Sequence, residues 1–449
     1  MSIQVNMNRA ALYRQTKSSR NVSNEFVLSK KQQSSVNLFF AAFIINCLSY
    51  LTAVTNNPVL SPAACQGFQA IALAMIIFAW INLVKFKFDN KYLEVVFIIF
   101  IIYSVTIVIR DPNYTYDIAK KVMFDPGMGM MGYLTPLVML FPRSIAVYKK
   151  AFKVVAIFGI LFFVYIIVYF NIVHDSNWKS LIALSYIENF FGVLAFPSGF
   201  ILLTFLYHPK KIKRLAFAVM FIGLYFLIFR ARRGAMFLCL TSLAGAGMIY
   251  LVHTKRTVLV ITLSVIFIFV GSVFVSNVKL PSMFDFLMSR GDEDTRSIME
   301  KYMKEDLTQN EWLFGKGING KYYCPVILDP NDLSMKRDII ETGYLQIILK
   351  GGLVHIILFC LIFLPAIFLG FFRSSNILSK AGALYILLAM VYTYPTIVTG
   401  FGLFYIWVWL SVGICYSKKI RNMSDEDITK YLSDVKPPSG KKKLRNAVS

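Results

Sequence analysis

The sequence predicts an all-α membrane protein that crosses the bilayer about twelve times and carries one long external loop between the ninth and tenth spans. Apolar residues make up 57% of the 449 residues and charged residues only 16%, whereas a soluble domain is about half apolar and a quarter charged. The mean hydropathy is +0.60. The apolar residues are gathered in stretches able to cross about 30 Å of hydrocarbon, where the backbone must be helical because lipid offers it no hydrogen-bond partner. A soluble enzyme, a disordered chain and a disulfide scaffold are therefore excluded.

The apolar stretches define the domain organisation. A basic tail at 1–36 precedes nine spans within 37–276, the external loop covers 277–343, three more spans fall within 344–416, and a second basic tail covers 417–449. The predicted spans are 37–54, 67–84, 92–109, 126–142, 154–173, 188–207, 215–229, 235–252, 257–276, 352–372, 381–397 and 400–416.

The net charge of +23 is first of all a sign of how the chain is oriented in the membrane, and only then of the partners it binds. If both termini are cytoplasmic, the cytoplasmic segments hold 30 Lys and Arg and the short external loops hold 7. This is the bias of the positive-inside rule. We therefore expect no nucleic-acid partner, and we expect the basic C-terminal run at 441–445 to contact anionic lipid.

Three arginines break this rule in the turn between the seventh and eighth spans. Arg230, Arg232 and Arg233 stand together on the external side, where positive charge disfavours insertion. Guanidinium groups bind phosphate through paired, charge-assisted hydrogen bonds. The cluster therefore favours a lipid-linked phosphate or pyrophosphate ligand, the alternative being a simple contact with lipid headgroups.

The external loop offers further candidates. Arg290 precedes Asp292 and Asp294, whose D-x-D spacing suits a divalent metal but often occurs by chance. Apolar residues recur in 295–307 with the period of an amphipathic helix. Three interpretations of this helix are open: it lies on the membrane, it packs over a cavity, or it belongs to a small packed subdomain. The glycines around Lys316 indicate an exposed, mobile backbone and only a weak phosphate loop.

The segment that leads into the tenth span is the candidate catalytic region. Its pattern places Arg337, Asp338, Glu341 and Tyr344 on one helical face. A carboxylate beside an arginine can act as a general base, although acidic residues also favour a helix start without any function. Within the tenth span, His355 is more typical of a structural histidine than of a proton carrier.

Two other patterns limit the function classes. The only acidic residues in the spans, Glu94 and Glu188, lie near span ends, whereas ion-coupled carriers usually need a carboxylate at mid-membrane. The external loop also does not divide the chain into two six-span halves. Both facts count against a transporter. Cys65 and Cys324 fall in predicted loops, so a disulfide between them is open.

These motifs together resemble the superfamily of O-antigen and capsule polysaccharide polymerases (Wzy) and O-antigen ligases of bacterial envelopes. The run Arg233-Gly234-Ala235 is similar to the family's serine-arginine-glycine turn, with Arg232 in place of the serine. The stretch from Trp312 to Gly317 resembles part of the family's large periplasmic loop, and 341–352 resembles the segment that re-enters the membrane. Ligases usually carry a histidine near the start of that segment, where this chain has Asp338 and Glu341, which favours a polymerase.

The resemblance implies a GT-C-like fold and a metal-independent inverting glycosyltransferase without a cofactor. Its donor would be a glycan on undecaprenyl pyrophosphate, and its acceptor a hydroxyl of a lipid-linked repeat unit. Glu341 or Asp338 would then activate the acceptor. The residues that would stabilise the departing pyrophosphate are Arg233, Arg230, Arg290 and Arg337.

The resemblance also implies a location and partners. The protein would lie in the bacterial inner membrane, among membrane lipids, with a chain-length regulator as a possible partner. A ligase that joins finished glycan to an acceptor lipid, and a flippase for lipid-linked oligosaccharide, remain the alternatives.

Overall fold

The computed structural model describes residues 28–55, 60–110, 115–174, 180–230, 232–254, 295–326 and 334–432. The described residues are mostly helical, and β1 (Tyr322–Tyr323) and β2 (Lys336–Arg337) form one antiparallel pair. Eight of the described helical segments are long and apolar enough to cross a membrane. The prediction of an all-α, multi-pass membrane protein is therefore confirmed at this level.

Eleven of the predicted spans coincide with apolar helices, and the predicted span 257–276 lies outside the described residues. The eight long segments are α2 (Lys30–Val54), α3 (Pro62–Leu83), α4 (Lys91–Ile109), α7 (Ile145–Val168), the run Ile182–Leu203, α11 (Lys210–Phe229), α12 (Arg233–Thr254) and α17 (Gly343–Phe372). The run Ile182–Leu203 is built from α9 (Leu181–Phe190), η2 (Phe191–Ala195) and α10 (Ser198–Leu203). The three shorter apolar segments are α6 with η1 (Met130–Leu134, Thr135–Leu140), α18 (Ile377–Tyr392) and α19 (Leu403–Tyr416).

Side-chain caps begin several helices earlier than the apolar runs alone predict. Ser29 and Gln32 form a capping box at the start of α2. The Ser144 hydroxyl accepts a hydrogen bond from the Ala146 amide, so α7 begins at Ile145 rather than at residue 154. These caps satisfy backbone amides that the first turn leaves without partners.

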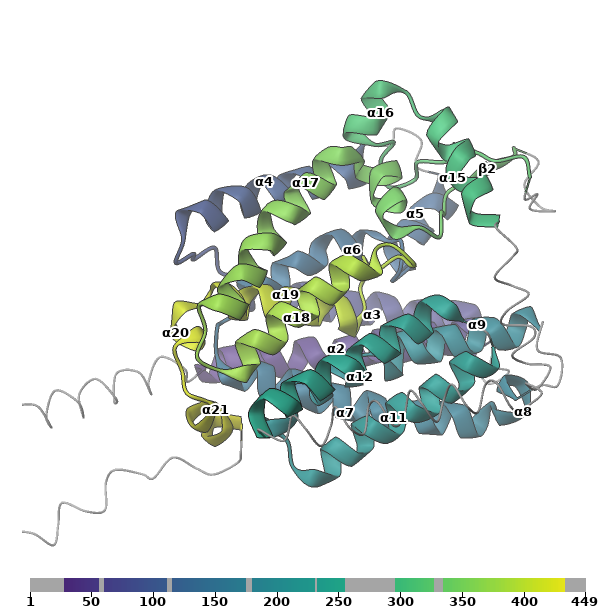
Figure 1. The fold of residues 1–449 in the computed structure, drawn as a ribbon. Coiled ribbons are helices and arrows are strands. Elements are labelled where there is room, and N and C mark those ends of the chain that lie inside the picture. Colours follow the sequence, from purple (N-terminus) through teal and green to yellow (C-terminus); the bar gives the residue numbers. More distant parts are fainter. Residues whose placement is uncertain are drawn as a thin grey trace, which may run out of the picture.

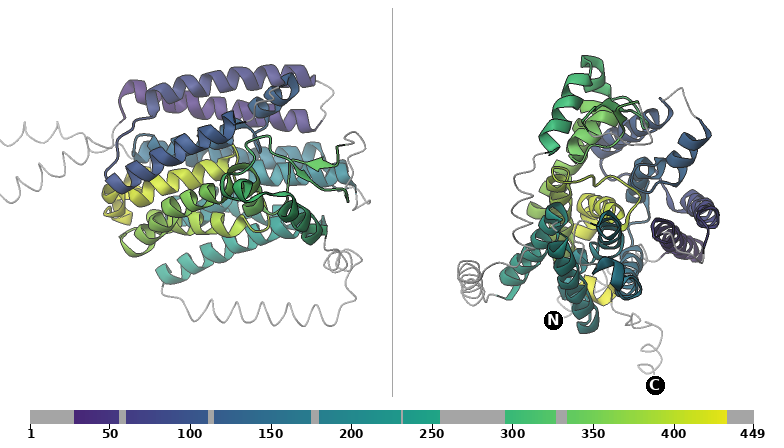
Figure 2. Two further views of the ribbon diagram at one scale, coloured as in Figure 1. Left: turned by 90° about the horizontal axis from the view of Figure 1, so that it is seen from above. Right: turned by 90° about the vertical axis from the view of Figure 1, so that its right-hand side faces the viewer.

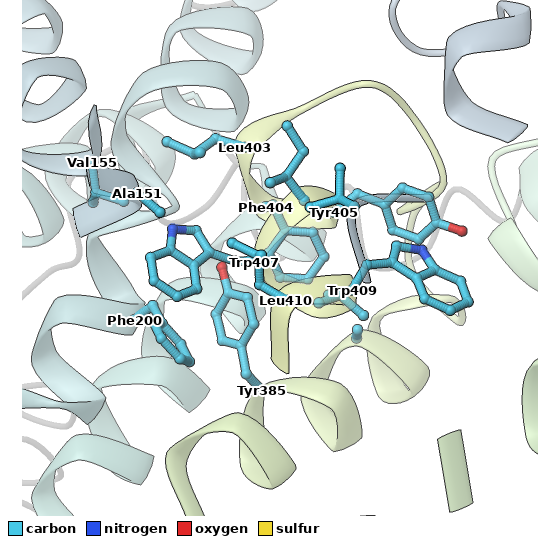
Figure 3. Close-up of a cluster of buried hydrophobic side chains, with 14 of the residues drawn as sticks. Ala151, Val155, Phe200, Tyr385, Leu403, Phe404, Tyr405, Trp407, Trp409 and Leu410 are labelled. Carbon is cyan, nitrogen blue, oxygen red and sulfur yellow. The ribbon is translucent and has the colours of Figure 1, made fainter. Parts of the chain in front are cut away.

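The short helix α19 occupies the centre of the bundle. All of its residues are buried, and Figure 2 shows it end-on among the other helices. Trp407 packs its ring against Phe200 (Figure 3), and the two ring centroids are 4.4 Å apart. The ring centroid of Phe152 lies 4.7 Å from that of Trp407. A helix enclosed by protein does not have to match the hydrocarbon thickness, so its shortness is compatible with a position inside a membrane bundle.

The two ends of the bundle carry different elements (Figure 1). One end, here named the loop end, carries α5 (Tyr116–Phe124), α8 (Phe170–Val173), α15 (Thr295–Asp306) and α16 (Gln309–Phe314). The opposite end carries η3 (Phe205–Tyr207), α20 (Lys418–Arg421) and α21 (Asp425–Leu432).

The residues at 295–326 and 334–342 form a loop subdomain that packs on the first turns of α17. Its core contains Met299, Met303 and Tyr322, all buried, together with Leu345 and Leu349 of α17. The amphipathic helix predicted at 295–307 is confirmed as α15. Of its three interpretations, the structure shows the packed subdomain.

The structure corrects one local prediction, a helical face holding Arg337, Asp338, Glu341 and Tyr344. The strand β2 pairs with β1 through Tyr322, and α17 begins only at Gly343. Between them, the Gln346 side chain accepts from the Ile340 amide at 2.9 Å. Sheet pairing and this side chain satisfy the backbone without a helix.

Candidate functional site

The loop subdomain docks on a break in α17. Gly352 has φ = 68° and ψ = −176°, which interrupts the helical backbone. The break leaves carbonyl groups of the preceding turn without helical partners. The amides of Lys316 and Gly317 donate to the carbonyls of Leu349 and Lys350, at 2.8 and 2.9 Å. The loop after α16 therefore completes the hydrogen bonding of the broken helix.

Two glycines make this docking possible. A Cβ on Gly352 would lie 2.2 Å from the Leu313 carbonyl oxygen, and a Cβ on Gly315 would lie 2.4 Å from the Lys350 carbonyl oxygen. Both have positive φ, a region that favours glycine. The predicted exposed, mobile backbone around Lys316 is therefore wrong. The Lys316 ammonium is 2.5 Å from the Asp306 carboxylate, and its side chain is only 18% exposed.

On one side of the α17 start, Glu341 lies beside an arginine. Its carboxylate accepts from Arg296 Nε at 3.0 Å, and Arg296 Nη2 also donates to the Pro395 carbonyl at 3.4 Å. On α12, Gly234 lies against the same residue, since a Cβ there would be 3.4 Å from the Pro395 oxygen. The start of α12, which follows the arginine turn in sequence, and the Arg296–Glu341 pair therefore flank Pro395 together. We name this arrangement the arginine side.

The arginines of the turn have different surroundings. Arg230 is fully buried, and its guanidinium donates to the Val173 carbonyl at 2.6 and 3.1 Å. Arg230 thereby supports the end of α8, and its role as an anion ligand stays a prediction. Arg232 forms an ion pair with Glu188, at 2.9 Å. The backbone of Arg233 begins α12, but its side chain lies outside the described part of the structure.

Of the remaining predicted anion ligands, Arg337 is described by the structure and is not brought to the arginine side. The side chain of Arg337 contacts the Met299 sulfur at 3.1 Å inside the loop subdomain. Arg290, with Asp292 and Asp294, lies outside the described residues. Their roles stay predictions.

On the other side of the α17 start, Asp338 forms an ion pair with Lys121 of α5. Burial raises the pKa of the Asp338 carboxyl, but the hydrogen bond and charge of Lys121 outweigh it, so that this pKa lies below its usual value. Lys350, on the first part of α17, adds a second positive charge near the carboxylate. The two candidate carboxylates therefore have separate cationic partners, Asp338 toward α5 and Glu341 toward α12.

A cavity lies on the Asp338 side, between α4, α6, α17 and α19. Its volume is about 470 Å³, including space open to solvent. Its lining includes the polar and aromatic side chains of Ser104, Tyr133, Gln346, Lys350, His355 and Tyr405. Gln346 also donates to the Asp338 carbonyl at 3.1 Å, which joins the cavity wall to the candidate catalytic segment.

Some site residues escaped the sequence reasoning. Lys350 is a single charge inside an apolar helix, a signal that could have singled it out. The pairing of Lys121 with Asp338 and of Arg296 with Glu341 had no local signal, because the partners are distant in sequence. Cys65 lies within α3 and Cys324 in the loop subdomain, and both thiols are free and buried, so the structure does not pair them.

Comparisons with known proteins add no relative. The chain matches no protein-family model, no curated protein and no solved structure.

Proposed function

We propose that the protein is a polysaccharide repeat-unit polymerase of the bacterial inner membrane, with a GT-C-like fold of twelve spans and both termini cytoplasmic. It transfers a glycan from undecaprenyl pyrophosphate to a lipid-linked repeat unit, as a metal-independent inverting glycosyltransferase. The observation that carries the proposal is the arginine side, where Gly234 at the start of α12 and the Arg296–Glu341 pair lie beside Pro395 at the loop end. Motifs that resemble the polymerase and ligase superfamily are thus next to one another.

In this proposal the arginines stabilise the leaving group. As the acceptor hydroxyl oxygen attacks the anomeric carbon of the donor, the bond from that carbon to the pyrophosphate oxygen breaks. The electron pair departs with the lipid pyrophosphate, and in this proposal Arg233, Arg232 and Arg296 stabilise its growing negative charge. Attack from the opposite face inverts the configuration of the anomeric carbon.

Glu341 is the better candidate than Asp338 for the general base. Its side chain is 58% exposed, so an acceptor hydroxyl can reach it, and Arg296 orients it. Asp338 is more enclosed and is held by Lys121. In the proposed reaction Glu341 takes the proton of the attacking hydroxyl, and Asp338 supports the segment on which Glu341 stands.

The proposal is tested with the purified full-length protein and a lipid-linked repeat unit, without added metal. Longer lipid-linked chains should form, and Glu341→Gln and Arg296→Gln should each slow this by about 100-fold, or about 3 kcal/mol. Lys301→Met, a change at a lysine that is 74% exposed on α15, is the matched control and should leave the rate unchanged. An absolute metal requirement, or full activity in both site variants, would contradict the mechanism.

Surface polysaccharide and lipid-linked glycan from intact cells separate the alternatives. A polymerase deletion should lose long chains and retain single repeat units. Long lipid-linked chains that accumulate without delivery would indicate a ligase. Repeat units confined to the cytoplasmic face would indicate a flippase. If a chain-length regulator is a partner, its removal should broaden the length distribution without abolishing polymerisation.

A further inference from the structure

The cavity beside α17 contains a buried cation, Lys350, with which no carboxylate among the described residues forms an ion pair. Lys350 is only 5% exposed. Its ammonium donates one hydrogen bond, to the Gly320 carbonyl at 2.9 Å, and no ion pair joins it to a carboxylate in the described part of the chain. The Asp338 carboxylate is close enough to interact electrostatically with the Lys350 ammonium, but Asp338 forms its ion pair with Lys121. A buried charge is costly unless a partner of opposite charge neutralises it.

Two buried polar side chains that line the same cavity make no hydrogen bond to the described part of the chain. His355 is 4% exposed and Ser104 is 1% exposed. Neither ring nitrogen of His355, nor the Ser104 hydroxyl, has a hydrogen-bond partner among the described residues. Buried polar groups normally have one. A hydroxyl and a neutral imidazole can each donate one hydrogen bond, and Lys350 retains two ammonium protons beyond the one bound to Gly320.

The walls of the cavity keep these donors in place. The ring of His355 lies between those of Phe359, Phe100 and Tyr133, with centroid distances of 4.7, 5.4 and 6.0 Å. Ser104 follows Tyr103 on α4, and the Tyr103 hydroxyl donates to the Gly351 carbonyl at 2.7 Å. Aromatic packing and this hydrogen bond therefore hold α4 and the break in α17 together, so the donors are preorganised.

We propose that Lys350, His355 and Ser104 form a binding site for one oxyanion of the carboxylate type. The ammonium supplies the opposite charge, and the imidazole and hydroxyl each donate a hydrogen bond to the anion's oxygens. The anion is either the carboxylate of an acidic sugar or a free small carboxylate. An acidic sugar as the ligand rests on the proposed function, because the site would then select repeat units that contain an acidic sugar. A free small carboxylate as the ligand does not rest on it.

Equilibrium binding to the detergent-purified full-length protein tests the site without any lipid-linked substrate. The probes are sodium glucuronate, sodium acetate and glucose, followed by calorimetry at constant ionic strength. Both carboxylates should bind saturably and compete with each other, and neutral glucose should not bind. Tighter binding of glucuronate than of acetate identifies the acidic sugar as the source, whereas equal binding identifies the free carboxylate.

Variants separate the site from the fold. Lys350→Met should weaken carboxylate binding by at least about tenfold, since a charge-assisted hydrogen bond is lost. Ser104→Ala should weaken it in the same direction and removes no hydrogen bond seen in the protein, so it keeps the test valid if the lysine variant does not fold. Lys301→Met should bind like the parent. Absence of saturable carboxylate binding, or unchanged binding in Lys350→Met and Ser104→Ala, would overturn the proposal whether or not the protein polymerises glycan.

Discussion

The substitution Gly352→Ala should undock the loop subdomain from α17. The backbone at Gly352 lies in a region that essentially only glycine adopts, and a side chain there costs about 1–3 kcal/mol. The new Cβ would also lie 2.2 Å from the Leu313 carbonyl oxygen, so the loop must move.

The expected magnitude follows from the contacts that this movement breaks. The hydrogen bonds from the Lys316 and Gly317 amides to α17 contribute about 1 kcal/mol each. With the strain at Gly352, the docked state loses on the order of 3 kcal/mol, which is about a 100-fold increase in the opening equilibrium of the loop.

Amide hydrogen exchange in the full-length protein, followed in the proteolytic fragment that covers residues 312–320, measures this opening directly. The Lys316 and Gly317 amides should exchange about 100-fold faster in Gly352→Ala than in the parent protein. The matched control is Gly247→Ala on α12, where a Cβ has no neighbour within 4 Å and alanine favours the helix. Equal protection of 312–320 in the parent and in Gly352→Ala would refute the reasoning that the break and the loop depend on each other.

Three further substitutions report on buried polar groups. Arg230→Leu removes the donors to the Val173 carbonyl and should lower the free energy of unfolding by about 3 kcal/mol. Loss of the proposed polymerase activity at unchanged stability would instead indicate a ligand contact. Burial, with the charge of Lys213, lowers the pKa of His208 in the folded protein to about 4. In the unfolded chain its pKa is about 6.5. Between these two pH values the unfolded chain binds the additional proton, so the folded protein loses stability as the pH falls from about 6.5 toward 4. When the pH is lowered from 7.5 to 5, the parent protein should therefore lose up to about 2 kcal/mol more free energy of unfolding than the His208→Phe variant, as measured by thermal unfolding. An equal loss in the two proteins would contradict the role of His208. Asn376→Ala removes hydrogen bonds to the Ile420 and Met423 carbonyls. Because these bonds hold the segment after residue 417, a protease should cleave that segment faster in the variant, whereas cleavage of the loop subdomain should not change.

The sequence predicted the apolar helices well because each is a continuous apolar run, a local property. It predicted their beginnings less well. The cap at Ser144 lies in a basic, polar segment that an apolar window ignores. Helical spacing at 337–344 was misleading because pairing with Tyr322 and the reach of Gln346, both set by the tertiary fold, decide the backbone there.

The candidate site was predictable in its residue types but not in its pairings. Clustered arginines and the carboxylates Asp338 and Glu341 stand out as charges beside membrane spans. Which cation each carboxylate meets depends on contacts between distant segments, such as Lys121 with Asp338. One sequence holds no local signal for such a pair. The buried hydroxyl of Ser104 likewise becomes a candidate ligand only when α4 and α17 enclose it with Lys350.

The central position of α19 has a consequence for biogenesis. Of the apolar helices that the structure describes, α19 is the last to leave the ribosome, yet its neighbours enclose it on all sides. The earlier helices must therefore enter the membrane as a loose assembly that stays open until Leu403–Tyr416 arrives. Nascent chains that stop before this point lack Trp407, against which Phe152 and Phe200 pack in the folded bundle. Such chains should be recognised as unassembled and degraded, which makes completion of translation a checkpoint for a folded bundle.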